Sequence, residues 1–111
     1  MILRKYRAPR YDPKLNSAYL RWIRTLPCVV CWQLRPLRQF AASEAAHVGE
    51  RGLGQKCADT QTVPLCPYHH RTGPLSAHAM GKRFWVYWRL NRFELIADYN
   101  RRFEEENRDA A

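Results

Sequence analysis

Apolar side chains recur at helical spacing near the start of the chain. Asp12 can cap a helix with its side chain, and Pro13 suits the first helical position. Pro27 would end such a helix. The pattern therefore predicts a helix over residues 12–26, with these apolar positions facing the core: Leu15, Ala18, Tyr19, Trp22, Ile23 and Leu26.

The middle of the chain alternates short apolar stretches with loops. We expect a tight turn at "CVVC" (28–31) and a loop over 32–41. Short strands are predicted within "SEAAHVGE" (43–50) and "TQTVPLC" (60–66). The basic segment "RGLGQK" (51–56) has two glycines and predicts a flexible loop between the two strands.

Helical patterns return in the last third of the chain. Pro67 can open a short helix, which Gly73 and Pro74 would interrupt. A longer helix is predicted over about 75–90, and Asn91 with Glu94 resembles a capping box for a last helix through about 106. Its candidate core positions are Phe93, Ile96, Ala97, Tyr99 and Phe103. Together these elements predict a small α+β domain.

Charge points to a nucleic-acid partner. The chain has 19 Lys and Arg against 10 Asp and Glu, a net charge of +9, and most of its cations are arginine. A guanidinium donates two parallel hydrogen bonds to phosphate, so we expect DNA or RNA, with an inert basic surface as the alternative. An apolar run of about 18 residues is missing, so we expect no membrane span and no membrane partner. We read no secretory signal and expect a reducing, cytoplasmic setting.

Cysteine and histidine spacing predicts a structural zinc site. Cys28 and Cys31 form a CxxC pair, and Cys66 and His69 form a CxxH pair. Four such ligands satisfy tetrahedral zinc, and the ion would stabilise a chain with a small core. Cys57 is a competitor for the fourth position, but it stands alone in a glycine-rich loop, so we expect a free thiol.

The neighbouring histidines of "CPYHH" are expected to serve different sites. Consecutive side chains on a helix diverge by about 100°. If His69 faces zinc, His70 faces elsewhere, where His47 and His78 are available to the same cleft. The alternative is that some of these histidines are hydrogen-bonded structural residues.

The segments "CVVC", "EAAHVG" and "DTQTVPLCPYHH" resemble the HNH endonucleases, also called ββα-metal or His-Me finger nucleases. The likeness covers about residues 26–90 and is strongest to small phage-encoded or recombination-associated members with a zinc knuckle. It implies a ββα-metal core with the knuckle, flanked by N-terminal and C-terminal helices, in a bacterial or phage-infected cell. The implied organisation is a basic arm (1–11), one nuclease domain (12–107, with helix 12–26, knuckle and core 27–90 and helix 91–107) and a tail (108–111).

The resemblance also implies roles for individual residues. His47 matches the general base that activates water, and His70 matches a ligand of the catalytic divalent ion. His78 is the candidate for a further ligand, and Asp59 is an alternative because Ala46 stands where many members have a ligand. Either Asp59 or Gln61 would hold the imidazole of His47.

The implied reaction is hydrolysis of DNA phosphodiester bonds. The catalytic ion would be Mn²⁺, Ni²⁺, Zn²⁺ or Mg²⁺, with imidazole ligands disfavouring magnesium. Four cations flank the site segments and are predicted to contact phosphates: Arg51, Lys56, Arg71 and Arg83. The alternatives are a non-catalytic zinc-knuckle DNA-binding protein and an RNA-acting protein. A homodimer would suit double-strand cleavage.

Overall fold

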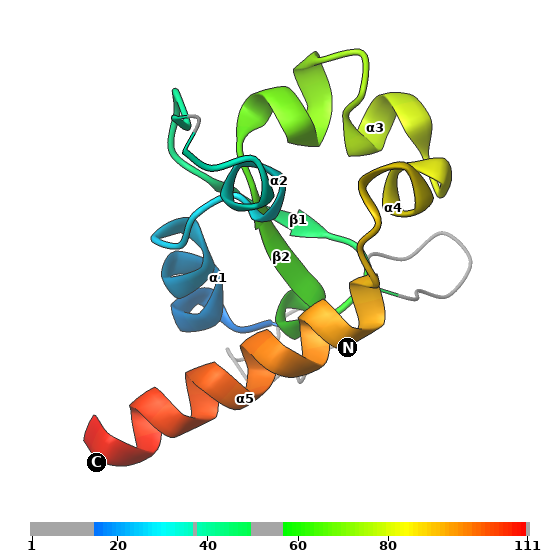
Figure 1. Ribbon diagram of the computed structural model, residues 1–111. Coiled ribbons are helices and arrows are strands. Elements are labelled where there is room, and N and C mark those ends of the chain that lie inside the picture. The colour runs from blue at the N-terminus through cyan, green and yellow to red at the C-terminus, as the bar shows by residue number, and fades with distance from the viewer. Residues whose placement is uncertain (1–14, 37, 50–56, 111) are drawn as a thin grey trace, which may run out of the picture.

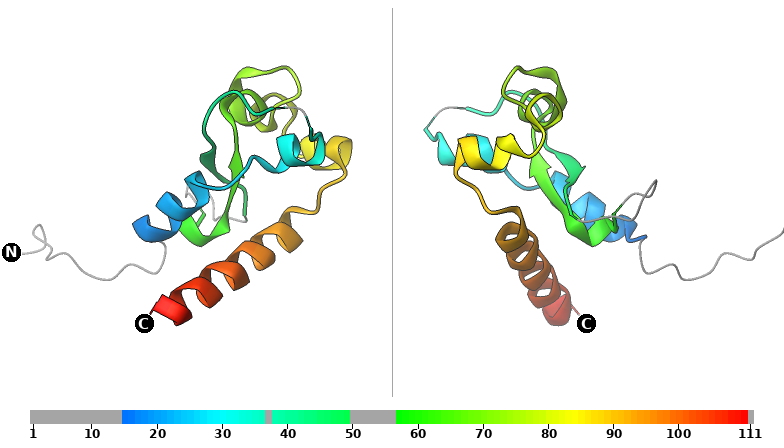
Figure 2. Two further views of the ribbon diagram at one scale, coloured as in Figure 1. Left: turned by 60° about the vertical axis from the view of Figure 1, so that its left-hand side comes forward. Right: turned by 90° about the vertical axis from the view of Figure 1, so that its right-hand side faces the viewer.

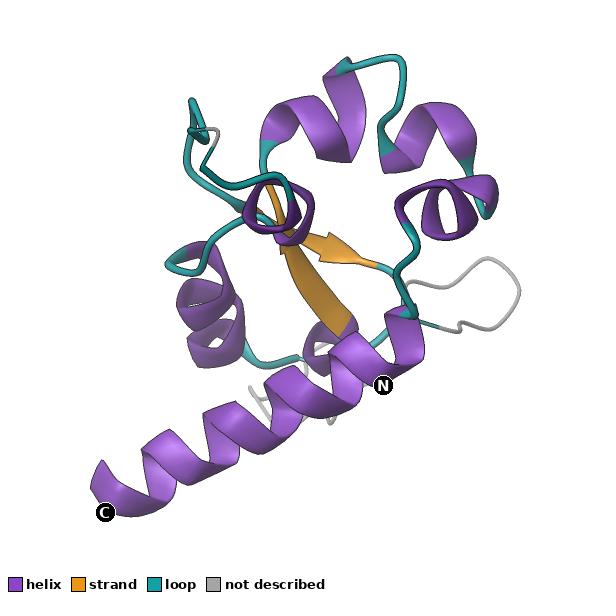
Figure 3. Ribbon diagram, viewed as in Figure 1, coloured by secondary structure: helices purple, strands orange, loops and turns teal. Residues whose placement is uncertain are grey.

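A two-stranded antiparallel sheet lies at the centre of a mainly helical α+β fold (Figures 1 and 3). The computed structural model describes residues 15–36, 38–49 and 57–110. Strand β1 (Glu44–His47) pairs with β2 (Thr62–Leu65) in a register that sets Glu44 opposite Leu65 and His47 opposite Thr62. Both predicted strands are therefore confirmed, with shorter bounds. Every residue of β2 is buried, so this strand forms the middle of the core.

Helix α1 (Ser17–Arg24) packs against both strands. Its cap is Asn16, whose side chain accepts a hydrogen bond from the Tyr19 N–H at 3.0 Å. The predicted start at Asp12 is therefore wrong, because Leu15 and Asn16 precede the helix and Leu15 is largely exposed. Asp12 itself lies outside the described residues.

The "CVVC" segment forms the start of a helix and not a plain turn. Helix α2 (Val29–Gln33) begins directly after Cys28, whose carbonyl accepts a hydrogen bond from the Trp32 N–H at 2.9 Å. Val29 and Val30 are buried against the sheet, and this burial favours a helical turn over an open one. The two cysteines therefore sit one helical turn apart.

The segment after β2 is broken into three short helices. A π-helical turn, η2 (Tyr68–Thr72), follows Pro67 and ends at Gly73, as predicted. The single helix predicted over 75–90 is wrong, because the chain forms α3 (Ala77–Met80) and α4 (Arg83–Trp88). Gly81 separates them with φ of 61°, a conformation that costs glycine little and breaks the helical path.

The last helix, α5 (Arg92–Ala110), begins where predicted and runs past residue 106. Asn91 Oδ1 accepts from the N–H groups of Phe93 (3.0 Å) and Glu94 (3.1 Å). The helix packs on β2 and on the 3₁₀ turn η1 (Asp59–Gln61), and the views in Figure 2 show it as one long rod beside the rest of the fold. Of its predicted core positions, Ile96 and Tyr99 are buried and Phe103 is partly buried, while Phe93 and Ala97 face solvent.

Some sequence predictions lie outside the described residues: the basic arm 1–11, Arg51 and Lys56. The helices that the structure describes include none with the length and apolar character needed to span a membrane.

Candidate metal centre and histidine cleft

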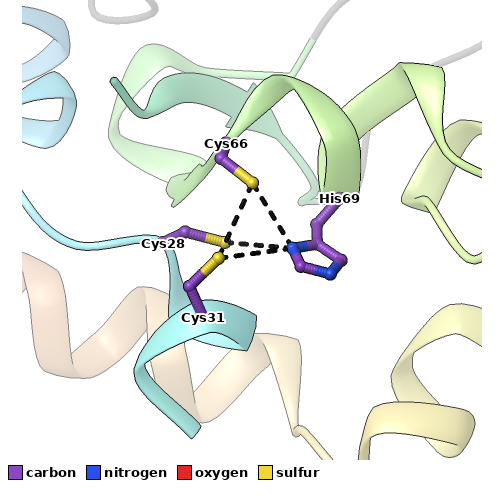
Figure 4. A group of neighbouring side chains, drawn as sticks. All are labelled: Cys28, Cys31, Cys66 and His69. Carbon is purple, nitrogen blue, oxygen red and sulfur yellow. Dashed lines mark hydrogen bonds between the residues drawn. The ribbon is translucent and has the colours of Figure 1, made fainter. Parts of the chain in front are cut away.

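Four side chains from three separate segments converge at one end of the sheet (Figure 4). Cys28 and Cys31 come from the start of α2, Cys66 from the turn after β2, and His69 from η2. His69 Nδ1 lies 3.8, 3.6 and 3.3 Å from the three sulfur atoms, in that order, and the sulfurs of Cys31 and Cys66 are 3.8 Å apart. The predicted Cys3His group is thus assembled.

These separations fit a tetrahedral zinc ion. Zinc binds thiolate sulfur at about 2.3 Å and imidazole nitrogen at about 2.0 Å, so a tetrahedron separates two sulfurs by about 3.8 Å and sulfur from nitrogen by about 3.5 Å. The observed distances of 3.3–3.8 Å match both values. The group can therefore hold one zinc ion with four protein ligands, as structural sites do.

The surroundings of the four ligands favour a shared cation. Burial raises the pKa of the Cys28 thiol. Burial, followed by the negative charges of neighbouring thiolates, raises the pKa of Cys31. Three thiolates in an apolar pocket need a positive ion to coexist. Burial also lowers the pKa of His69, which keeps its imidazole in the neutral form that binds metal.

Cys57 takes no part in this group. Its sulfur lies 3.8 Å from the carbonyl oxygen of Gln61, and the residue lines the same cleft as His47. Within the described part of the chain, the four residues above form the one set of three or more His, Cys, Asp or Glu side chains close enough to share an ion. His69, not Cys57, therefore completes the knuckle.

A second constellation is built at the other end of β1, where His47 meets Asp59. His47 Nε2 lies 2.9 Å from Asp59 Oδ1, and Asp59 Oδ2 accepts a hydrogen bond from the Asn16 N–H at 2.9 Å. Both carboxylate oxygens are therefore fixed, and a carboxylate bound to Nε2 favours the tautomer with its proton on that nitrogen. The lone pair of a neutral His47 then resides on Nδ1.

Gln61, the other candidate partner of His47, has a different position. Its carbonyl accepts a hydrogen bond from the Val48 N–H at 3.0 Å, and its side chain lies against Gly49. A Cβ atom placed on Gly49 would approach Gln61 Cβ to 2.6 Å. Asp59 is therefore the partner of His47, while Gln61 packs on the chain that follows β1.

The adjacent histidines separate as the helical geometry predicted. His69 points to the three cysteines, whereas His70 Nδ1 lies 2.7 Å from Oε1 of Glu44. Arg71 also binds Glu44, donating from Nε (3.0 Å) and Nη2 (2.7 Å). The Arg71 guanidinium, with His70, holds the pKa of Glu44 down at about 2. Glu44 is thus ionised near neutral pH and favours a proton on Nδ1 of His70.

His70 and His78 lie next to each other although they belong to two different helices, η2 and α3. Their ring centroids are 4.7 Å apart at an interplanar angle of 74°. His78 comes from α3, which packs on η2. The end of η2 at Gly73 therefore lets the chain turn back on itself. The structure therefore brings together the two histidines predicted to share a catalytic ion.

His47 and His78 line one cleft with a volume of about 440 Å³, whereas His70, which was expected to face the same cleft, is not among its lining residues. Lys82 and Arg92 also line it, and neither was among the predicted site residues. Arg92 donates to the Val48 carbonyl at 2.6 Å, which ties the start of α5 to the segment after β1. The sequence could have indicated Lys82, because it directly precedes the predicted Arg83. It could not have indicated Arg92, because the contact of Arg92 with Val48 depends on the packing of α5. The other described lining residues are Val48, Gly49, Cys57, Ala77, Gly81 and Trp85.

Arg71 and Arg83, which were predicted to contact phosphates, have different surroundings in the structure. Arg71 already forms its ion pair with Glu44, and Arg83 stands exposed at the start of α4, beside the cleft residue Lys82. A role of either arginine in phosphate binding stays a prediction. Glu44 was missed altogether, although it is the single acidic residue between Asp12 and Glu50 and lies three positions before His47.

Comparison with known proteins identifies relatives of unassigned activity. A family model described as "Protein of unknown function (DUF968)" matches residues 4–84, which include the Cys3His group and every cleft residue above except Trp85 and Arg92. The uncharacterized protein YdfU of Escherichia coli (strain K12) is 31% identical over 65 residues, which cover 56% of this chain and 17% of YdfU. This chain thus spans a minor part of that relative. No solved structure matches. Because the family model covers well over half of the sequence, the chain belongs to the DUF968 family.

Proposed function

We propose that this chain is a metal-dependent DNA endonuclease in which a zinc knuckle supports a cleft containing a histidine general base. The observation that carries the proposal is the pairing of Asp59 with His47, which lines a cleft together with His78 and Lys82. The order of β1, β2 and a helical turn bearing His70 agrees with the ββα-metal core of the HNH nucleases that the sequence resembles.

His47 has the arrangement that a general base requires. Asp59 accepts a hydrogen bond from the Nε2–H of His47, so that Nδ1 can take a proton from water. Asp59 then stabilises the imidazolium that forms. The Asn16 N–H holds the second oxygen of Asp59, which keeps the carboxylate oriented toward the ring.

His70 and His78 are the residues that would hold the catalytic divalent ion. Their adjacent rings offer two nitrogen ligands, and Glu44 orients His70 through its Nδ1. A carboxylate behind a ligating histidine fixes the ring and raises its basicity. An ion bound there would stabilise negative charge on the scissile phosphate and on the leaving oxygen.

Cations around the cleft suit a polyanionic substrate. Lys82 lines the cleft and Arg83 follows it on the exposed surface of α4. Arg51 and Lys56 belong to the segment that follows His47 in the sequence, and we propose that they also contact the phosphate backbone. Contacts of this kind give affinity without sequence preference and weaken steeply with salt.

A nicking assay tests the proposal. Supercoiled plasmid is incubated with the zinc-loaded protein and Mg²⁺, Mn²⁺, Co²⁺, Ni²⁺ or Zn²⁺ in turn. We expect nicking with at least one ion, its loss in His47→Ala, and a reduction of roughly 10- to 100-fold in Asp59→Asn, where the amide no longer fixes the imidazole tautomer. Gln61→Ala is the matched control and should retain most activity.

Zinc content separates a catalytic defect from loss of the fold. His47→Ala should retain about one zinc per chain and the wild-type circular dichroism spectrum. Nicking by His47→Ala at the wild-type rate would refute the general base. DNA binding without nicking under any ion would indicate a non-catalytic zinc-knuckle DNA-binding protein. Cleavage confined to RNA would show that the substrate is RNA.

A further inference from the structure

An apolar groove borders the knuckle and shares no lining residue with the cleft of His47 and His78. It runs between the loop that follows α2 and the η2 turn, and its volume is about 480 Å³. Its lining includes the knuckle residues Cys66 and His69 and the aromatic residues Phe40 and Tyr68. The lining is mainly apolar, and its other described members are Cys31, Leu34, Arg38, Ala41, Pro67 and Thr72. We call this the knuckle groove.

Phe40 is held in an exposed position by its neighbours. Its side chain is 99% exposed. The preceding Gln39 nevertheless accepts a hydrogen bond from the Cys28 N–H at 2.8 Å and donates to the Ala41 carbonyl at 2.7 Å and to Ser43 Oγ at 3.1 Å. The loop is thus anchored to the knuckle, and the exposure of Phe40 does not result from a lack of local contacts.

A second exposed aromatic ring, that of Tyr68, also lines the groove. Tyr68 is 55% exposed, and its ring packs edge-on against His69 with centroids 5.3 Å apart. A ligand of the metal therefore helps to hold this ring in place. Two exposed aromatic rings on anchored backbone that line the same groove form a surface on which a planar apolar group can stack.

Charge around the groove selects an anionic partner. Residues 31–43, which supply one side of the groove, contain two arginines and no acidic residue, and none of the described lining residues is acidic. Arg38 lines the groove, and Arg35 stacks over the ring of Trp32 at 4.3 Å. An apolar peptide would need no such charge, but a nucleic-acid strand has both planar bases and phosphates.

We propose that the knuckle groove binds an unpaired base of single-stranded DNA, with Phe40 and Tyr68 stacking on the base and Arg38 contacting its phosphate. Bases in a duplex are stacked on each other and do not offer their faces to such rings, so the groove selects unpaired DNA. The inference rests on the proposed function only in treating the bound strand as the substrate. In that case the enzyme acts on DNA with single-stranded segments.

Fluorescence anisotropy tests the binding directly. A labelled 20-nucleotide single strand and the corresponding blunt duplex are titrated with zinc-loaded His47→Ala protein, so that cleavage is not required. We expect tighter binding of the single strand. Phe40→Ala should weaken single-strand binding roughly 5- to 100-fold, as loss of one base–aromatic contact does, while Phe40→Trp should preserve it. Arg38→Ala should lower the slope of log K against log salt by about 0.7.

Matched controls are available on other surfaces. Phe93 is 51% exposed on α5, outside the groove, and Arg24 is exposed on α1. Phe93→Ala and Arg24→Ala should each change single-strand affinity less than twofold. Zinc content and circular dichroism identify any variant with a damaged knuckle, and Phe40→Ala should be normal in both because its ring is exposed.

Several results would overturn the proposal. These are single-strand binding by Phe40→Ala at the wild-type affinity, duplex binding with equal affinity and equal dependence on Phe40, or tenfold tighter binding of a single-stranded RNA of the same sequence. Failure to bind any strand, combined with self-association that Phe40→Ala abolishes, would assign the groove to a second copy of the chain. Single-strand binding by the wild-type protein that nicks no DNA with any of the divalent ions would refute the nuclease proposal alone.

Discussion

Glu44 Oε1 lies 2.7 Å from Nδ1 of His70, a contact between residues 26 positions apart in the sequence. The sheet register explains it, because Glu44 pairs with Leu65, the last residue before the turn that bears Cys66 and His70. Strand β1 therefore carries a carboxylate to the knuckle end of the sheet and His47 to the opposite end. One short strand positions both proposed parts of the catalytic site.

Replacing Glu44 tests whether this carboxylate orients a metal ligand. We expect Glu44→Gln to lower plasmid nicking roughly 10- to 100-fold, because a neutral amide holds the Nδ1–H of His70 less strongly. The concentration of Mn²⁺ or Ni²⁺ that supports half-maximal nicking should rise. The measurement is the nicking rate over a series of metal concentrations.

Arg71→Ala is the control for the Glu44 experiment. It removes the ion pair but leaves the contact between Glu44 and His70, so the metal dependence should change less than threefold. An unchanged metal dependence in Glu44→Gln would show that His70 does not bind the catalytic ion through this arrangement. Equal effects of both variants would indicate a purely structural role of the ion pair.

The knuckle is expected to hold one zinc ion that stabilises the fold. His69→Ala removes the single nitrogen ligand and should lower the bound zinc well below one per chain. Structural zinc contributes several kcal/mol in small domains, and about 1 kcal/mol changes the melting temperature by about 4–8 °C. We therefore expect Tm to fall by roughly 10 °C or more, measured by thermal circular dichroism with zinc content determined on the same samples.

Two substitutions make the zinc experiment specific. His69→Cys supplies a thiolate in place of the imidazole and should retain zinc, because four cysteines also form structural sites. Cys57→Ser alters a thiol outside the group and should leave zinc content unchanged. Loss of zinc in Cys57→Ser, or full zinc in His69→Ala, would contradict the Cys3His assignment.

The parts of this molecule that sequence patterns predict are those set by local chemistry. The spacing of Cys28, Cys31, Cys66 and His69 identifies the knuckle, because two-residue spacers place paired ligands on one ion. The divergence of His69 and His70 follows from helical geometry. The start of α5 follows from Asn91, whose side chain caps the first N–H groups of the helix. Each of these predictions depends on spacing within a short segment, although the knuckle joins two such segments, 28–31 and 66–69, that are separated by 34 residues.

Contacts between distant segments were not predictable in the same way. The Asn16 N–H binds Asp59 across 43 positions, and Glu44 reaches His70 across 26, so both depend on the packing of α1 and on the strand register. Gly81 breaks the helix predicted over 75–90, yet a glycine within a helical pattern is compatible with either outcome. The apolar pair Val29 and Val30 became helical because burial outweighed a weak local preference.

The close approach of Gly49 to Gln61 predicts that a larger side chain at residue 49 destabilises the fold. A Cβ on Gly49 would lie 2.6 Å from Gln61 Cβ, well inside van der Waals contact. We expect Gly49→Ala to reduce the free energy of unfolding by about 1–3 kcal/mol, as overpacking does. In a Gln61→Gly background the same change should cost clearly less, and urea denaturation of the four proteins gives the coupling energy. Equal costs in both backgrounds would place the strain elsewhere.

The buried phenol of Tyr99 predicts a loss of stability in alkali. Burial raises its pKa from 10.0 to about 12. Between these values the unfolded chain releases a proton that the folded chain retains, so stability falls as pH rises through that window. A difference of two pKa units corresponds to at most about 3 kcal/mol. Below pH 10 the phenol is neutral in both states and contributes no pH dependence.

Tyr99→Phe isolates this contribution, since phenylalanine keeps the ring against Arg102 and removes only the titrating hydroxyl. Burial also raises the pKa of Tyr19, so the wild-type slope alone does not identify the residue. We expect the free energies of unfolding of wild type and Tyr99→Phe, measured with urea, to maintain a constant difference from pH 7 to 9. Above pH 10 the wild type should lose stability faster than the variant. Parallel curves up to pH 11.5 would show that Tyr99 does not retain its proton in the folded state.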